Sequence, residues 1–289
     1  MGIDYNGASV LLHFKKLGVD YSETATIGRQ TLSLSTGDLR RAVRRHGKHA
    51  EANCMDFHAA DGFAEPFLHF IGADNIASFD YSDYQRASNI HDMNLKIAAD
   101  MHEKFSAVFD GGSLEHVFNF PVAIKNCMDM VRTGGHFISI CPANNFMGHG
   151  FYQFSPELFF SVFSPANGFD TVKILAYEDR PDTKFYEVLS PESLGERVTL
   201  INNRPVYLAV LARKCRHEIE LQIPQQSDYK LEWSKDSGQS SLRNCIVNRA
   251  SALGWLNALL PGRLKNRLKR VFCLQKPGFD SAQFREIQI

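Results

Sequence analysis

Short apolar runs alternate with helical patterns between about residues 23 and 214, and this alternation constrains the fold more than any other feature. The runs that we expect to form strands are Ala25–Ile27, Ile76–Phe79, Ala87–Ile90, Ala107–Phe109, His136–Ile140, Val172–Tyr177 and Val206–Ala212. The helical patterns between them are Thr36–His46, Gly62–Phe70, Pro121–Val131 and Ser155–Phe163. Strands separated by helices in this way build a mostly parallel sheet. The sequence therefore predicts an α/β three-layer sandwich that binds its ligands beyond the carboxyl ends of the strands.

Two of the expected helices carry local signals at their ends. Ser155 can cap the last one, because Pro156 then occupies the first helical position and Glu157 favours the positive end of the helix dipole. The pair Gly134-Gly135 is expected to close the helix before it in the left-handed conformation, with a strand following at once. Both signals agree with the alternation of elements.

After residue 214 the character of the sequence changes. We expect residues 1–214 to form the α/β domain, residues 215–240 a polar linker, and residues 241–289 a basic helical extension. The extension has leucines at helical spacing, followed by the basic run Arg263–Arg270. It can make a peripheral contact with an anionic membrane or a partner. The alternative, which is commoner for charge runs, is a solvated basic face whose leucines dock on the main domain.

The composition narrows the protein class. Apolar residues make up 44% of the chain and charged residues 22%, which excludes overall disorder. Lys plus Arg and Asp plus Glu each number 32, so the net charge does not indicate a nucleic-acid partner. The six cysteines lack CxxC spacing and the first residues lack a signal pattern, so we expect reduced thiols in a cytoplasmic protein. No run approaches the roughly 18 apolar residues of a membrane-spanning helix.

Two acidic residues follow apolar runs at positions where ligands bind. In nucleotide-binding α/β sheets an acid at the end of the second strand accepts hydrogen bonds from both ribose hydroxyls, and Asp80 has this position. Asp92 is followed by the apolar Met93, so its carboxylate can bond an exocyclic amine while the methionine packs on a purine face. For both acids the alternative is ordinary turn or cap chemistry.

The segment FDGGSLEHVFN breaks a strand at Gly111-Gly112 and leaves Glu115 and His116 at its mouth. Two glycines let the backbone come close to a ligand. Glutamate and histidine offer an acid, a base or metal ligands. The alternative for His116 is a structural role, which is the commoner one for a lone histidine.

The connection ANNFMGHGFYQFSP after the next strand is dense in asparagine, histidine, glycine and aromatic residues, and it contains His149. Long loops at strand ends that combine such groups are typical of binding sites. We expect Phe151–Phe154 to form a wall that suits a sugar or a flat metabolite.

In this order, the Asp-ended strand, the Asp-containing turn, FDGGSLEHVFN and RTGGHFISICP resemble the class I S-adenosylmethionine-dependent methyltransferases of the small-molecule branch, over about residues 22–214. FDGGSLEHVFN and HGFYQFSPELF are similar to segments of a bacterial subgroup of that family. The resemblance implies S-adenosylmethionine as cofactor. It also implies a seven-stranded sheet of order 3-2-1-4-5-7-6 with an antiparallel last strand, and a bacterial surface-glycan or secondary-metabolite setting.

The resemblance further implies roles for single residues. Asp80 would bind the cofactor ribose, and Asp92 and Met93 would flank the adenine. Asp110, Gly111 and Gly112 would face the methionine moiety or the substrate.

One part of the family pattern, the glycine-rich loop after the first strand, is missing here. The segment TATIGRQTLS keeps only Gly28, and Arg29 and Gln30 stand where small residues wrap the cofactor. The interval from Gly28 to Asp80 exceeds the roughly 20 residues usual in dinucleotide sheets, which indicates an inserted segment around Gly47–Asp61. One hypothesis makes Arg29 and Gln30 a replacement clamp that holds the cofactor carboxylate or an acidic substrate. The other is that the fold has lost its cofactor.

Methyl transfer is an in-line displacement, so the protein mainly aligns the acceptor and excludes water. For a hydroxyl acceptor we expect His149 or His116 as general base, with Glu115 as its orienter. The predicted function is methyl transfer to a hydroxyl or amine of a small molecule or sugar. The alternatives are a scaffold or binding protein on this fold, and a nucleic-acid methyltransferase, for which the flipped-base motif is missing. A metal-dependent hydrolase using Asp92, Glu115, His116 and His149 lacks HxxEH or HExxH spacing.

Overall fold

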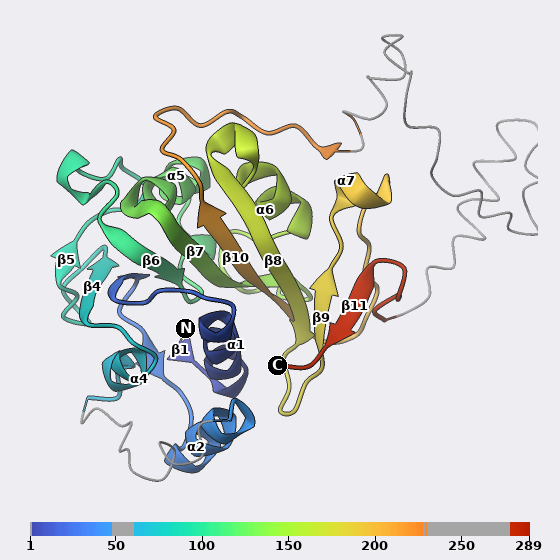
Figure 1. The fold of residues 1–289 in the computed structure, drawn as a ribbon, viewed down its shortest axis with the longest axis horizontal. Helices are drawn as coiled ribbons and strands as arrows, with labels where there is room; N and C mark the ends of the chain where they lie inside the picture. The colour runs from blue at the N-terminus through green and yellow to red at the C-terminus, as the bar shows by residue number, and fades with distance from the viewer. Residues whose placement is uncertain (1, 48–60, 228, 230–277) are drawn as a thin grey trace, which may run out of the picture.

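The central feature of the computed structural model, which describes residues 2–47, 61–227, 229 and 278–289, is a nine-stranded sheet (Figure 1). Its strands follow the order β11-β9-β8-β10-β7-β6-β2-β4-β5. In chain order they are β2 (Glu23–Ile27), β4 (Asn75–Asp80), β5 (Asn89–Ile90), β6 (Phe105–Asp110), β7 (Val131–Asn144), β8 (Phe169–Glu178), β9 (Phe185–Val188), β10 (Val206–Lys214) and β11 (Phe284–Ile287). All seven strands expected from the sequence are present.

The pairing of these strands confirms the expected topology. β2 is parallel to β4 and β6, β4 is parallel to β5, and β6 is parallel to β7. β10 is antiparallel to both β7 and β8. Numbered along the chain without β9 and β11, the order is 3-2-1-4-5-7-6, with the last strand antiparallel. The expected count of seven strands is wrong, because β9 and β11 extend the sheet at one edge.

Helices cover both faces of the sheet, as alternation along a strand requires. On β6, Val108 belongs to one apolar core, whereas Ala107 and Phe109 belong to the other. The helices are α1 (Tyr5–Lys16), α2 (Thr36–Arg45), α4 (Glu65–Phe70), α5 (Phe120–Met130), α6 (Pro156–Val162) and α7 (Pro191–Leu194), with 3-10 turns η1 (Ala99–Met101), η2 (Leu114–His116) and η3 (Pro165–Asn167). Residues of α1, α2 and α4 fill one core, and residues of α5 and α6 fill the other.

The N-terminal residues form structure that the sequence pattern did not predict. Asp4 caps α1, since its carboxylate accepts a hydrogen bond from the Gly7 backbone N–H at 2.7 Å. Before α1, β1 (Gly2–Ile3) pairs in parallel with β3 (Thr31–Leu32) in a separate two-stranded sheet. Residues of β1, β3 and α1 belong to the apolar core on one face of the central sheet.

The expected helix ends are partly wrong. Ser35 caps α2, because its hydroxyl accepts from the Asp38 N–H. Ser155 occupies the N-cap position of α6 but makes no side-chain capping bond. Gly134 has the expected positive φ of 85°, but it lies inside β7, and α5 ends at Met130. The helix therefore stops before the glycine pair, which instead turns the strand.

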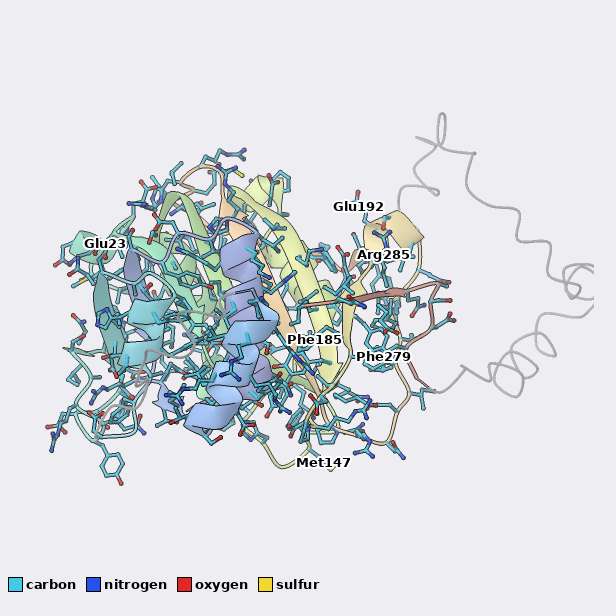
Figure 2. All side chains as sticks on the ribbon, turned by 60° about the horizontal axis from the view of Figure 1, so that its bottom comes forward. Glu23, Met147, Phe185, Glu192, Phe279 and Arg285 are labelled. Atoms are coloured by element: carbon cyan, nitrogen blue, oxygen red, sulfur yellow. The ribbon has the colours of Figure 1, made fainter. Side chains whose placement is uncertain are left out.

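The chain after residue 214 is not separate from the α/β domain where it is described. The Cys215 N–H donates to the Gly168 carbonyl, and the Ser227 hydroxyl donates to Glu157, so this part of the expected linker packs on the domain. Near the C-terminus Phe279 stacks on Tyr186, and β11 completes the sheet edge (Figures 1 and 2). A helical extension over 241–289 is therefore wrong for its last residues.

The remaining sequence predictions for this part of the chain are not tested. The basic run Arg263–Arg270 lies outside the described residues, and so does most of the inserted segment around Gly47–Asp61. Within the described ranges no helix combines the length and apolar character needed to cross a membrane.

His46, which ends α2, provides a pH test of the N-terminal helices. Its ring is 6% exposed and neither ring nitrogen has a hydrogen-bond partner in the described structure. Burial, together with the charges of Lys16, His13 and Arg45, lowers its pKa to about 4. The unfolded chain binds this proton near pH 6.5, so the associated stability is present above that pH and is lost as the pH falls toward 4.

We predict that the free energy of unfolding falls between pH 6.5 and 4, with His46 contributing up to about 1.4 kcal/mol per pH unit. His46→Phe removes this contribution, so its unfolding free energy, measured by urea titration, should fall less steeply. Equal slopes for the two proteins would contradict the assignment.

Candidate functional site

A cavity of about 320 Å³ lies beyond the carboxyl ends of β2, β4, β5 and β6. Gly28 follows β2, Asp80 ends β4, Asp92 and Met93 follow β5, and Gly112 follows β6. Its other lining residues are Ile27, Phe79, Tyr81, His91, Asn94, Ser113, His116 and Val117. The topology thus collects in one place residues that are up to 90 positions apart, from Ile27 to Val117.

The two acids of this cavity differ in what they bind. Within the described chain no group donates a hydrogen bond to the Asp80 carboxylate. The Asp80 backbone carbonyl accepts a hydrogen bond from the His91 N–H at 2.8 Å. Asp92 instead accepts from the backbone and side-chain nitrogens of Asn94, at 2.9 and 2.8 Å, and these bonds lower its pKa. Asp80 is therefore available to a ligand, whereas Asp92 also forms the turn that was its alternative interpretation.

Asn126 of α5, which the sequence analysis did not single out, fixes the loop that carries Met93. Its side-chain nitrogen donates to the Leu95 carbonyl at 2.7 Å and the Met93 carbonyl at 3.3 Å. Its oxygen accepts from the Ile97 N–H at 2.9 Å. Met93 is 5% exposed and forms part of the cavity wall. In the sequence, the only signal for this role is an asparagine in the second half of the predicted helix Pro121–Val131.

Gly28 is required by the close approach of two loops. Its φ is 71°, and an added Cβ would lie 2.8 Å from the Ser113 hydroxyl oxygen. The Ser113 hydroxyl donates to the Ile27 carbonyl at 2.8 Å, and the Gly28 N–H donates to the Phe79 carbonyl at 2.7 Å. The Gly28 N–H is therefore already used in a backbone hydrogen bond within the sheet region.

Gln30 fills the space between the loops after β2 and β6. Its side chain is buried, and its amide nitrogen donates to the carbonyls of Ile27 and Gly28, at 2.8 and 3.2 Å. An added Cβ on Gly111 would lie 2.2 Å from the Gln30 side-chain oxygen, so only glycine fits beside it. That oxygen has no hydrogen-bond partner in the described structure.

Arg29 does not face the cavity, so the expectation that it clamps a cofactor is not met. Its guanidinium forms ion pairs with Asp61 at 2.9 Å and Glu65 at 2.6 Å. It also lies 3.7 Å from the ring centroid of Phe63 and donates to the Gln85 carbonyl at 3.2 Å. Arg29 thus ties the start of α4 to the turn after β4. Of the replacement clamp, only Gln30 lies beside the cavity.

Asp110 and Glu115 are both buried, but only Asp110 is satisfied by hydrogen bonds. Asp110 accepts from the backbone N–H groups of Ser113 and Leu114, and from the Ser139 hydroxyl at 2.7 Å. Neither carboxyl oxygen of Glu115 has a hydrogen-bond partner in the described structure. Burial and the charge of Asp110 raise the Glu115 pKa to about 8. Asp110 thus stabilises the turn after β6, whereas both carboxyl oxygens of Glu115 remain able to bind a donor or a cation.

Glu115, His116 and His149 form one cluster beside the first cavity. The His149 Nε2 lies 3.3 Å from a Glu115 oxygen, although the pair is not aligned as a hydrogen bond. The ring centroids of His116 and His149 are 5.1 Å apart. One donor atom from each of the three residues lies within 4.8 Å of the others, a spacing that can hold a metal ion. Asp92 is not part of this cluster.

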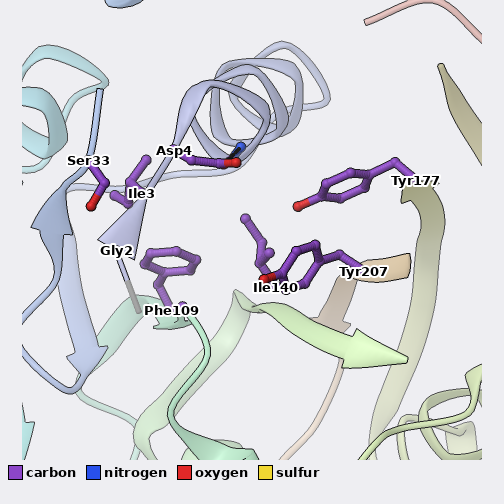
Figure 3. A pocket seen from close by; sticks show the side chains of 10 residues that line it. Gly2, Ile3, Asp4, Ser33, Phe109, Ile140, Tyr177 and Tyr207 are labelled. Carbon is purple, nitrogen blue, oxygen red and sulfur yellow. Dashed lines mark hydrogen bonds between the residues drawn. The ribbon is translucent and has the colours of Figure 1, made fainter. Parts of the chain in front are cut away.

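A second cavity, of about 180 Å³, lies between α1 and the sheet (Figure 3). Its lining residues are Gly2, Ile3, Asp4, Gly7, Ser33, Phe109, Gly111, Ile140, Tyr177 and Tyr207. Figure 3 shows the Asp4 carboxylate and the Tyr177 hydroxyl turned toward the same space. Burial raises the pKa of both tyrosines, so they are uncharged donors. Gly111 lines this cavity and Gly112 lines the first, with Gln30 against Gly111.

The segment Phe151–Phe154, expected to form an aromatic wall, lies away from both of these cavities. Phe154 is 4% exposed and belongs to the core. Tyr152 donates its hydroxyl to the Phe118 carbonyl at 2.6 Å, and Phe151 stacks edge-on against Phe118 at the surface. None of these residues lines either of the two cavities. The apolar lining of the second cavity comes instead from the N-terminus and from strands.

The comparisons with known proteins add distant likenesses only. No family model and no curated protein matches the chain. TehB from Haemophilus influenzae is similar with 13% identity and a TM-score of 0.36, over 71% of this chain and 61% of that one, so the match spans less than two thirds of TehB. The 1,6-didemethyltoxoflavin-N1-methyltransferase of Burkholderia thailandensis, solved with 1,6-didemethyltoxoflavin and S-adenosylhomocysteine, is similar with 13% identity and a TM-score of 0.39, over 73% of this chain and 78% of that one. The strand order of the sheet is the one that the resemblance noted in the sequence implies.

Asn126→Ala tests how the cavity wall is held. The change leaves the Ile97 N–H and two carbonyls without their partner, so we predict a loss of about 2–4 kcal/mol in the free energy of unfolding. Asn75→Ala removes a hydrogen bond to Glu23 at the surface and should cost less than about 1 kcal/mol. Urea denaturation measures both, and an equal cost would show that Asn126 has no special role.

Proposed function

We propose that this protein is an S-adenosylmethionine-dependent methyltransferase acting on a small molecule. The observation that carries the proposal is the position of the first cavity. β2 is followed in the sheet by β4 on one side and β6 on the other, so the chain connections diverge at this point. In open α/β sheets the crevice at such a switch point, beyond the carboxyl ends of the strands, is where nucleotide-like ligands bind.

The residues of the first cavity match the parts of an adenosyl group. The unoccupied Asp80 carboxylate at the end of β4 is placed to accept hydrogen bonds from the two ribose hydroxyls. Met93 supplies an apolar wall for the adenine, and Asp92 retains one oxygen for its exocyclic amine. The volume of about 320 Å³ is within the range of small-ligand sites.

The second cavity is the proposed acceptor site. It is apolar on the sheet side, through Phe109 and Ile140, and polar at Asp4, Tyr177 and Tyr207. At about 180 Å³ it suits a small molecule or a single sugar ring, and its carboxylate and hydroxyls suit an acceptor with an amine or hydroxyl. Nucleic acid is not part of this proposal.

Gly112 lines the first cavity and Gly111 lines the second, so the methionine arm of the cofactor would have to lie beside this glycine pair, against which Gln30 packs. In this proposal the Gln30 side chain turns aside when the cofactor binds, which breaks its hydrogen bonds to the Ile27 and Gly28 carbonyls. His149, beside Glu115, and His116 are the bases expected for a hydroxyl acceptor, but neither lines the second cavity, so this role requires the acceptor to reach toward the first cavity.

The same glutamine supports a second candidate function. With Gln30 fixed in place, the first cavity accepts a nucleoside but not the methionine arm, and the protein binds a ligand without methyl transfer. Formation of S-adenosylhomocysteine from S-adenosylmethionine, screened over small amines and sugars, separates the two functions. Product formation with any acceptor excludes the binding-only function.

Asp80→Ala tests the placement of the ribose. Each hydrogen bond to a charged partner contributes about 1.5–3 kcal/mol, so we predict that calorimetry shows at least about a tenfold loss of S-adenosylhomocysteine affinity. Asp83→Ala is the matched control, because Asp83 lies exposed in the same turn and does not line the cavity. If both variants keep the affinity of the unmodified protein, Asp80 is not in the site.

A further inference from the structure

We propose that Glu115, His116 and His149 bind one divalent transition-metal ion of the zinc type. One donor atom from each residue lies within 4.8 Å of the others. Metal binding would draw these atoms together, since a zinc ion lies about 2.0–2.2 Å from its nitrogen and oxygen ligands. This proposal concerns the binding of an ion and holds whether or not the protein transfers methyl groups.

The strongest evidence for the site is the unsatisfied carboxyl group of Glu115. Its side chain is fully buried, and neither oxygen accepts a hydrogen bond from the described residues. Asp110, the neighbouring buried acid, has three donors of its own and contributes a second negative charge. Buried carboxylates require hydrogen bonds or a cation. A metal ion would provide the positively charged partner that the Glu115 carboxylate lacks.

The backbone holds the ligands in place from two elements. Glu115 and His116 lie in η2 after β6, and His149 lies in the loop between β7 and α6. The Phe151 N–H donates to the Glu115 carbonyl at 2.8 Å. An added Cβ on Gly150 would lie 2.8 Å from the same carbonyl oxygen, so the two segments touch closely beside His149. The sheet and this contact preorganise the site.

The donor set indicates which ion binds. Two imidazoles and one carboxylate favour zinc, iron(II), cobalt(II) or manganese(II), whereas magnesium and calcium prefer oxygen ligands. Three protein ligands leave a coordination position open. His116 also lines the first cavity, so that position is next to a bound ligand. His149 accepts no proton while it binds metal, and its proposed role as a base then applies to the metal-free protein only.

A second cluster, formed by His102, Asp129 and His217, has metal-ligand atoms at a similar spacing and is therefore the alternative site that the experiment must separate. Asp129 is already paired with the Lys125 ammonium group, which makes it a poorer ligand. The two clusters can be separated by mutation because they share no residue.

The test is a calorimetric titration of the full chain, stripped with a chelator and free of cofactor, with Zn²⁺ and separately with Mg²⁺. We expect one Zn²⁺ per chain with micromolar or tighter affinity, and no comparable binding of Mg²⁺. His149→Ala and Glu115→Gln should each weaken Zn²⁺ binding on the order of 100-fold. His217→Ala should leave the affinity unchanged. Zn²⁺ should also raise the melting temperature of the unmodified protein, and not that of His149→Ala.

Three results would overturn the proposal. They are no Zn²⁺ binding, binding that only His217→Ala abolishes, and equal affinity in His149→Ala. Because His149 is partly exposed, its replacement is expected to fold, and circular dichroism checks this for each variant. The cofactor is absent from every titration, so failure of the methyltransferase proposal does not affect the outcome.

Discussion

The pairing of β2 with β4 on one side and β6 on the other determines where the first cavity lies. Because all three strands run parallel, their carboxyl ends meet at one edge, and the residues that follow them converge there. Gly28, Asp80 and Gly112 are brought together in this way, although long stretches of chain separate them. Moving one of these strands by a residue would turn its core side chains to the opposite face, so the two apolar cores fix the register of the site.

The sequence was sufficient to predict seven of the nine strands of the central sheet, since their apolar runs and the helices between them follow local periodicities. Asp80 and Gly112 could be placed because strand ends converge in such a sheet. β11 could not be predicted, because four residues near the C-terminus pair with a strand about a hundred positions earlier. The end of α5 at Met130 also depends on tertiary context, since β7 begins directly after it.

Side-chain partners were the harder part of the site to predict. Arg29 stands next to the cavity in sequence, yet Asp61, Glu65 and the Phe63 ring hold it elsewhere. Asp4, Tyr177 and Tyr207 reach the second cavity from three distant elements, and no local pattern marks them. The adjacent Glu115 and His116 were visible in the sequence, but the contact with His149 required the folded loop.

The proposed function depends most on Gln30, whose buried side chain donates to the Ile27 and Gly28 carbonyls and packs against Gly111. The most direct measurement compares the affinities of S-adenosylhomocysteine and adenosine for the unmodified protein and for Gln30→Ala. Cofactor binding must break the two hydrogen bonds of Gln30, so the variant should bind S-adenosylhomocysteine about tenfold more tightly. Its affinity for adenosine, which lacks the methionine arm, should not change. Equal changes for both ligands, or weaker binding of S-adenosylhomocysteine, would contradict the account.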